Sequence, residues 1–127
     1  MSGRAKSGAF IYAKNLQALA DFYVQFLGLE IQHTHHELII LRADGLQLVI
    51  HQMPTEIAEE TILTSPPEER DSAILLFFTI DDLEQAPVRA QALGGVVFPE
   101  IWQGPGFQVC NACDPEGNVF QIRQSEA

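Results

Sequence analysis

Three histidines stand close together at positions 33, 35 and 36, a residue type and spacing that could bind a transition metal. Alternate residues of an extended strand share a face, so His33 and His35 could hold one ion jointly while His36 points to the other side. The same segment also fits a polar strand at the edge of a sheet near a turn, which needs no metal. We favour the polar edge strand, and the metal site stays open as the alternative.

A second group with chemical potential is the pair Cys110 and Cys113, which are separated by two residues. In redox enzymes this spacing works at a helix N-terminus, where the helix dipole lowers the thiol pKa. Here the pair leads into the turn at residues 114–117, between two predicted strands, and one cysteine pair does not complete a four-ligand zinc site. We therefore expect structural thiols. Two free cysteines also fit a reducing compartment, so we expect a cytoplasmic protein.

The elements that must position these residues begin with a strand predicted at residues 8–13. Asn15 is a good N-cap for the helix that follows, whose apolar residues recur with helical spacing until Gly28 ends it. The Asp44-Gly45 pair is a strong hairpin signal between two later strands. Three short strands complete this part of the chain, at residues 29–36, 38–43 and 46–52.

The same order of elements returns after a connector at residues 53–72, which is rich in proline and acidic residues and has one helical turn near residues 56–60. Residues 73–80 predict a strand, and Asp81-Asp82 can cap a helix that runs to about Leu93. Three more strands follow, at residues 96–102, 107–112 and 118–124.

The repeated order predicts an α+β fold in which two strand–helix–three-strand modules form a curved mixed sheet around a cavity. We expect one domain over residues 1–127, with modules at about residues 8–52 and 73–124. Alternation gives each strand a uniformly apolar face, which should pack under the helices, and a mixed face, which should line the cavity. A solvated sheet face is the alternative, but such a face rarely collects large apolar groups such as Phe10 and Phe77.

The charge of the chain narrows the classes of partner. Its net charge is −10, from 17 acidic and 7 basic residues. Phosphate contacts need a basic surface, so we expect no nucleic-acid partner. No apolar run approaches the ~20 residues of a membrane-spanning helix, so we expect no membrane partner. A small molecule remains as the expected partner class.

Two sequence motifs carry a resemblance to a known family. The first is Asn15-Leu16 followed by Asp21-Phe22-Tyr23 and Phe26-Leu27-Gly28-Leu29. The second is Asp114-Pro-Glu-Gly-Asn118 followed by Phe120-Gln121-Ile122. Together they resemble the vicinal oxygen chelate superfamily of glyoxalase I, extradiol dioxygenases and bleomycin-resistance proteins. The similarity covers nearly the whole chain and is weakest in the connector. It implies the fold described above and a homodimer, since the resembling proteins usually complete their cavities that way.

The resemblance also implies where a metal would be bound. In the metal-dependent members, His and Glu side chains from the first and fourth strands of each module bind a divalent ion. The matching positions of this chain hold Gly8, Gln47, Leu75 and Gln121. Because none of these is an imidazole or a carboxylate, we expect no metal and no cofactor.

That pattern is similar to the bleomycin-resistance branch, in which a metal-free cavity at a dimer interface binds a drug and aromatic side chains stack on planar groups of the ligand. Amide, imidazole and guanidinium groups would supply polar contacts. Alternation places His51 on the cavity face, where it could also act as a general base. Glu100, beside Trp102, is the nearest acidic candidate. The candidate ligand-binding residues are Phe10, Gln47, His51, Phe77, Trp102, Phe107, Gln121 and Arg123.

Three hypotheses for the function follow. The first is a metal-independent small-molecule binding protein of the glyoxalase/bleomycin-resistance type, with sequestration of a ligand or antibiotic as one form of it. The alternative is an enzyme of the same superfamily, a lyase, isomerase or dioxygenase, which uses His51 as a base or non-standard metal ligands such as His33 and His35. The third is a regulatory subunit whose cavity is filled by its own side chains.

Overall fold

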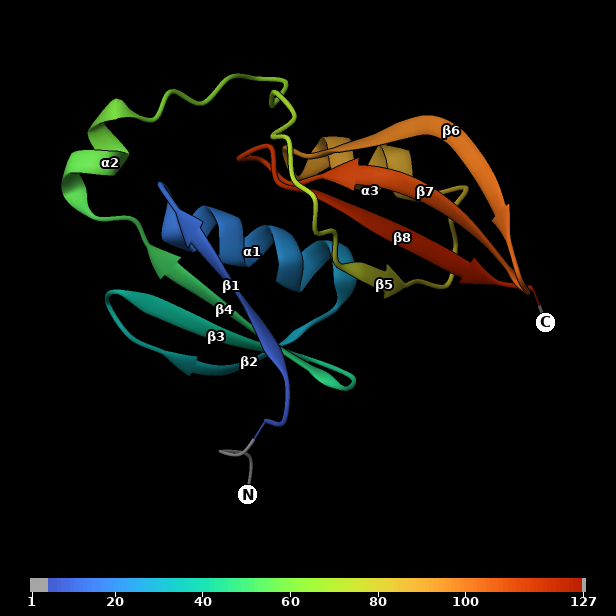
Figure 1. Ribbon diagram of the computed structural model, residues 1–127, viewed down its shortest axis with the longest axis horizontal. Helices are drawn as coiled ribbons and strands as arrows, with labels where there is room; N and C mark the ends of the chain where they lie inside the picture. Colours follow the sequence, from blue (N-terminus) through green and yellow to red (C-terminus); the bar gives the residue numbers. More distant parts are fainter. Residues whose placement is uncertain (1–4, 127) are drawn as a thin grey trace. The chain divides into compact units, whose positions relative to one another are not determined.

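The computed structural model describes residues 5–126, and its elements follow the predicted order of two strand–helix–three-strand modules (Figure 1). The chain divides into two compact units, of which the first ends at Ile62 and the second begins at Leu63. Each unit contains one four-stranded mixed sheet. The predicted α+β class is therefore confirmed.

The first unit is built on a sheet with the strand order β1-β4-β3-β2, in which β1 runs parallel to β4 and the other pairs are antiparallel. Helix α1 packs on one face of this sheet, against β3 and β4. Its buried residues include Leu19, Phe22 and Phe26, and the strands oppose them with side chains such as Leu48 and Ile50. The elements are β1 (Gly8–Ala13), α1 (Leu16–Leu27), β2 (Glu30–Thr34), β3 (Leu38–Ala43), β4 (Leu46–Gln52) and α2 (Thr55–Glu60).

The second unit repeats this arrangement with the strand order β5-β8-β7-β6, and β5 is parallel to β8. Helix α3 packs against β6. On the apolar face, the rings of Phe78 and Phe120 meet edge to face with centroids 5.9 Å apart, and Ile122 is fully buried. The elements are β5 (Phe77–Thr79), α3 (Ala86–Ala92), β6 (Val96–Gly104), β7 (Phe107–Cys113) and β8 (Val119–Ser125).

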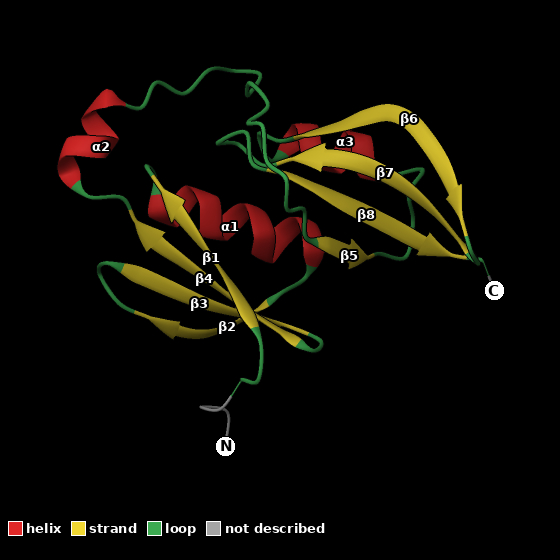
Figure 2. Cartoon of the chain, in the orientation of Figure 1, coloured by secondary structure: helices red, strands yellow, loops and turns green. Residues whose placement is uncertain are grey.

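Two elements of the second unit are shorter than predicted, and local hydrogen bonds explain both differences. The Ser72 hydroxyl donates to the Ile74 carbonyl at 2.8 Å and accepts the Ile74 N–H at 3.2 Å, a turn that keeps residues 73–76 out of the strand. Asp82 does not cap the helix, because its carboxylate accepts the N–H of Glu84 at 2.9 Å in a turn that precedes α3. Figure 2 shows the loop between α2 and β5.

The first unit differs from the prediction at two points. Strand β2 ends at Thr34, two residues earlier than predicted, after a break in register between Ile31 and His33. Asn15 occupies the N-cap position of α1, but its side chain makes no capping hydrogen bond within the described part of the chain. Gly28 ends α1 as predicted, with a left-handed φ of 70°. Among residues 5–126, no helix combines the length and the apolar character needed to cross a membrane.

Candidate functional site

Three of the predicted ligand-binding residues lie together on the first unit, on the sheet face opposite α1. The register places Tyr12 beside His51 and Gly8 beside Gln47, so Phe10, which alternates with them on β1, shares their face. The Phe10 ring lies 6.2 Å from the His51 ring and 6.1 Å from the Tyr12 ring, measured between centroids. Tyr12 therefore belongs to this face, and it does not pack against α1. Phe10 is 60% exposed.

The polar members of this face have defined partners. Nδ1 of His51 lies 2.9 Å from the carbonyl oxygen of Gln52. A carbonyl only accepts hydrogen bonds, so this contact requires a proton on Nδ1, and in the neutral ring Nε2 is then the acceptor. Gln47 donates from Nε2 to Oε1 of Gln32 at 3.2 Å. His51 therefore presents a nitrogen that could bind a ligand donor or take up a proton.

The other five predicted residues lie together on the second unit, on one face of its sheet. They come from all four strands. Phe77 is paired with Gln121, and Arg123 follows Gln121 on the same face of β8. Val109 lies opposite both Arg123 and Trp102, and this register places Phe107, two residues before Val109, on the same side. We call this set of Phe77, Trp102, Phe107, Gln121 and Arg123 the arginine face.

The guanidinium group of Arg123 contacts two aromatic rings on the arginine face. Its Cζ lies 3.6 Å from the centre of the Phe77 ring and 4.2 Å from the centre of the Phe107 ring. The two rings stand on β5 and β7, the strands on either side of β8. Both contacts have the geometry of cation–π interactions. No described residue forms a hydrogen bond or an ion pair with the guanidinium group of Arg123, and its Nε is buried.

Two further residues support the arginine face and were not predicted from the sequence. Gly104 is paired with Phe107, and a Cβ atom at Gly104 would overlap the Phe107 ring. The absence of a side chain at Gly104 thus lets the ring lie over β6. Asn111 is paired with Gln121, and its buried Oδ1 has no hydrogen-bond partner among residues 5–126. Alternation along β7 could have predicted Asn111 as a member of this face, because it lies four residues after Phe107 and therefore on the same side of the strand.

The positions that would hold a metal do not suit one. Gly8 lies beside Gln47, and a Cβ atom at Gly8 would lie 2.6 Å from the Gln47 carbonyl oxygen, so no ligating side chain fits there without a shift of the backbone. In the second unit the residue paired with Gln121 is Phe77, and Leu75 precedes β5. Neutral amides beside Gly and Phe are a poor donor set for a divalent ion.

The histidine cluster is arranged differently from the prediction. The rings of His35 and His36 lie 4.1 Å apart between centroids, so the expectation that His36 points away was wrong. Nδ1 of His35 accepts the N–H of Glu37 at 3.2 Å. Both rings border an open depression of about 620 Å³ at the start of α1, which none of the eight predicted residues lines. Within residues 5–126, no group of three or more His, Cys, Asp or Glu residues could hold a metal.

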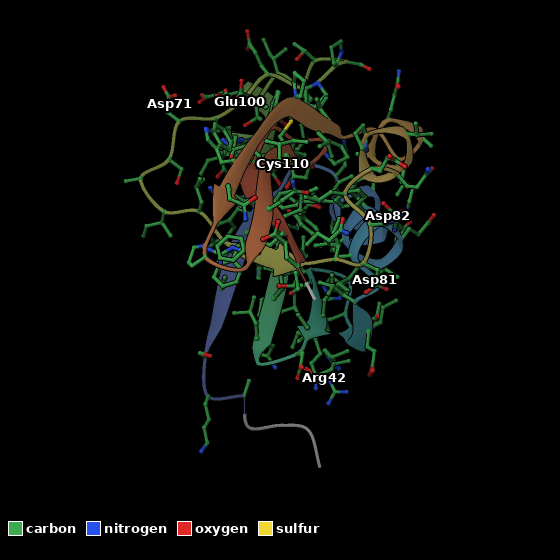
Figure 3. All side chains as sticks on the ribbon, turned by 90° about the vertical axis from the view of Figure 1, so that its right-hand side faces the viewer. Arg42, Asp71, Asp81, Asp82, Glu100 and Cys110 are labelled. Atoms are coloured by element: carbon green, nitrogen blue, oxygen red, sulfur yellow. The ribbon has the colours of Figure 1, made fainter. Side chains whose placement is uncertain are left out.

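Both cysteines are free and buried on β7. Burial raises the pKa of the Cys110 thiol. Burial, together with the charges of Asp114 and Glu69, raises the pKa of Cys113 to about 11. Both thiols are therefore protonated at neutral pH, which disfavours their use as nucleophiles. Figure 3 labels Cys110 and also Glu100, which is exposed on β6 and forms no ion pair with Arg123.

Comparison with known proteins adds the family to this geometry. The sequence model of a glyoxalase-like domain matches residues 9–123. No match was found among curated proteins. A glyoxalase/bleomycin resistance protein/dioxygenase family enzyme from Burkholderia phytofirmans is 21% identical, with a TM-score of 0.71 and coverage of 94% of this chain and 97% of that one.

Two other solved structures carry more specific names. A fosfomycin resistance protein from Listeria monocytogenes is 17% identical, with a TM-score of 0.69 and coverage of 98% of this chain and 94% of its own. A lactoylglutathione lyase from Agrobacterium tumefaciens is 21% identical, with a TM-score of 0.61 and coverage of 99% and 97%. At these identities the structural likeness establishes the fold.

Proposed function

Because the chain belongs to the family of glyoxalase-like domains, we propose that it binds a small organic molecule without the aid of a metal ion, and that the arginine face is the principal binding surface. Sequestration of a ligand or an antibiotic is the form of this function that needs no further chemistry. The fosfomycin resistance protein among the structural neighbours bears a name that is consistent with such a role.

The observation that carries the proposal is the composition of the arginine face. It combines a cation held on two aromatic rings with polar atoms that no described residue satisfies. Phe77 is 52% exposed and Trp102 is 41% exposed, so both offer aromatic surface to a ligand. Binding sites typically join aromatic walls to a few polar groups that fix the orientation of the ligand.

The face of the first unit that carries Phe10, Gln47 and His51 is proposed as a second contact surface. Its exposed Phe10 ring could stack on a planar group, and the acceptor Nε2 of His51 could bind a ligand N–H or O–H. These contacts are uncharged as long as His51 is neutral. The face of the first unit taken by itself therefore suits a planar ligand that carries an N–H or O–H donor.

Independence from metal rests on the donor set. Gly8 and Leu75 have no ligating atom in their side chains, and Gln47 and Gln121 offer only neutral amide oxygens. A divalent ion in this fold would need several charged or imidazole ligands that converge on it. We therefore expect binding to persist in the presence of a chelator, and we expect elemental analysis of untagged protein to find no stoichiometric Zn, Ni, Mn or Fe.

A ligand screen tests the proposal directly. Trp102 is the single tryptophan of the chain, so its indole N–H gives one resonance in a ¹H–¹⁵N spectrum that reports on the arginine face. We expect aromatic metabolites or antibiotics to shift this resonance in a saturable way and to raise the melting temperature, with or without EDTA. Failure of the whole collection to move the resonance would defeat the proposal.

Matched variants separate the arginine face from unspecific binding to apolar surface. Phe77→Leu removes an aromatic ring from this face, and we expect it to weaken binding about tenfold, since a ring contact with Arg and ligand is lost. Val88→Ala removes an exposed apolar side chain from α3 and serves as the control, with no expected change in binding. Equal effects of the two variants would contradict the proposed location.

An enzyme of the same family is the second candidate, and the orientation of His51 favours it. In the neutral imidazole its Nδ1–H contact with Gln52 directs the lone pair to Nε2, the nitrogen that would act as a general base in an isomerase or lyase reaction. Any probe that binds in the screen should therefore also be monitored for turnover. Conversion that disappears in His51→Gln, while binding remains, would replace sequestration by catalysis.

A further inference from the structure

We infer that the ligand of the arginine face is an anion, an aromatic or conjugated carboxylate whose charged group pairs with Arg123. This inference rests on the proposed function, because it names the chemical class that the same surface would take. It follows from the hydrogen-bonding state of Arg123, from the distribution of charge around it and from the aromatic rings that its guanidinium group contacts.

The hydrogen-bonding state of Arg123 is the first argument. A guanidinium group has five N–H donors, and none of them has a partner among the described residues. Its Nε is buried, so water does not reach that atom to replace a protein partner. A buried donor without a partner is costly, and a cation beside apolar surface is more costly still. The two rings offset part of this cost but supply no acceptor atoms.

The distribution of charge is the second argument. The chain has 17 acidic residues, yet no described carboxylate lies within ion-pair distance of Arg123. The polar neighbours on its face include the neutral side chains of Gln121, Asn111 and Thr79, which is paired with Arg123. The surface around Arg123 is therefore locally cationic in a protein with a net charge of −10. A ligand anion would supply the negative charge that no described residue places beside the Arg123 guanidinium group.

The aromatic contacts of the guanidinium group narrow the class of anion. Its carbon lies within 4.2 Å of both ring centres, so Phe77 and Phe107 cover part of the group without offering it a hydrogen-bond acceptor. The planar fork of N–H donors of an arginine matches a carboxylate in a bidentate pair. The exposed rings of Phe77 and Trp102 would contact a planar apolar body attached to that carboxylate.

Asn111 adds a detail to this class. Its Oδ1 is a buried acceptor without a partner among residues 5–126, and it lies on the strand beside Gln121. If the Asn111 side chain turns to expose this atom when the ligand binds, a hydroxyl or N–H group next to the ligand carboxylate would donate to it. Hydroxylated aromatic acids should therefore bind more tightly than the unsubstituted acids.

Matched probes test the sign of the charge. We would titrate the protein with benzoate, naphthoate and cinnamate, with the corresponding neutral amides, and with the corresponding amines. The readouts are the Trp102 indole resonance and the dissociation constant from calorimetry. We expect each acid to bind at least about tenfold more tightly than its amide, because a charge-assisted pair is stronger than a neutral hydrogen bond. We expect the amines to bind most weakly.

Two arginine variants locate the effect. Arg123→Gln should reduce the preference for acid over amide to about twofold or less, because the cation is lost while a hydrogen-bonding side chain remains. Arg42→Gln is the control: it removes the same charge from an exposed arginine of the first unit, whose present partner is Glu30 at 3.0 Å, and it should leave the preference unchanged. The ¹H–¹⁵N spectrum of each variant shows whether it is folded.

The outcomes separate this inference from the proposed function. If amides or amines bind as tightly as the acids, the inference fails and the proposal of small-molecule binding stands. If the acids are preferred equally by the wild type and by Arg123→Gln, the anion binds elsewhere and the inference also fails. If no probe of any charge moves the Trp102 resonance, the proposed function and the inference fall together.

Discussion

Asn111 and Arg123 set the energetics of the arginine face at the level of single residues. Each keeps a buried polar atom that no described residue satisfies. A buried polar atom without a partner costs about 1–3 kcal/mol of stability. Such atoms are rare in native cores. Their presence on two neighbouring strands indicates a site where hydrogen bonds to a ligand would offset the loss of stability.

Replacing Asn111 with Leu tests this interpretation. The change keeps the size of the side chain and removes the unsatisfied amide, so we expect the free energy of unfolding to stay equal or to rise by about 1 kcal/mol. Ligand affinity should fall at the same time, since the acceptor is lost. Urea denaturation measures the first effect, and the titration of hydroxylated aromatic acids measures the second.

Asn118→Leu is the matched comparison. Nδ2 of Asn118 donates to the Asp114 carboxylate at 2.9 Å, so removing this amide breaks an existing bond, and stability should fall. If Asn111→Leu proves as destabilising as Asn118→Leu, then Asn111 has a structural role and the interpretation of its Oδ1 is wrong.

The sequence predicts the position of some residues of the arginine face better than that of others. Period-two alternation is enough to place Gln121 and Arg123 on one face, because β8 is a regular strand. The same reasoning missed Asn111, because a neutral amide in a strand has no distinctive chemistry until its partners are known. Gly104 was missed for a different reason. It leaves room for the Phe107 ring on the paired strand, and only the pairing register shows that the two residues are neighbours.

At the scale of elements, the turn between β7 and β8 is the most highly bonded feature of the second unit. Asp114 is fully buried, and its carboxylate accepts the N–H groups of Glu116 at 2.9 Å and Asn118 at 3.1 Å. Arg70 donates from Nε to the Glu116 carbonyl at 3.0 Å, which fixes the end of the connector to this turn. The turn thereby sets the register in which β8 presents Arg123.

We predict that Asp114→Ala destabilises the protein by roughly 3 kcal/mol, because it leaves the buried N–H of Glu116 and the partly buried N–H of Asn118 without this acceptor. Asp114→Asn keeps one acceptor oxygen and should cost less. The midpoint of urea unfolding measures both changes, and the slope of the transition should stay constant. A loss below about 1 kcal/mol for the alanine variant would show that water or other groups satisfy the turn.

The elements that were predicted well are those with strong local signals. Strands β1, β3 and β4 match their predicted limits because alternation, the Asp44-Gly45 turn and apolar content agree. β5 and α3 are shorter because side chains of Ser72 and Asp82 bond to the nearby backbone, and such competition cannot be weighed from composition. These differences leave the alternation of the arginine face intact.

For the whole molecule, the fold could be predicted from the sequence, whereas the class of ligand could not. The order of the elements was predicted from periodicity and turns, and the match of residues 9–123 to a glyoxalase-like domain agrees with it. The ligand was out of reach, because recognition depends on which strands are neighbours and on which polar atoms lack partners. Those facts belong to the folded chain, and they turn a general expectation of aromatic binding into a specific one of anion binding.

The homodimer expected from the resemblance is the last prediction, and it also belongs to the whole molecule. Large apolar side chains such as Phe10, Ile31 and Phe77 are more than half exposed, and exposed apolar surface is typical of proteins that associate. Light scattering should therefore give about twice the 14.1 kDa of the chain. Each copy has a net charge of −10, so repulsion opposes association at low ionic strength.

Added salt screens that repulsion without weakening apolar contacts, so the dissociation constant of the dimer should fall as salt is raised. A dimer held by ion pairs would respond in the opposite direction, and this contrast identifies the kind of interface. Binding of a carboxylate to Arg123 adds negative charge, so aromatic acids should make the salt dependence steeper if the arginine face lies near the interface. A mass of one chain at every salt and protein concentration would contradict the dimer.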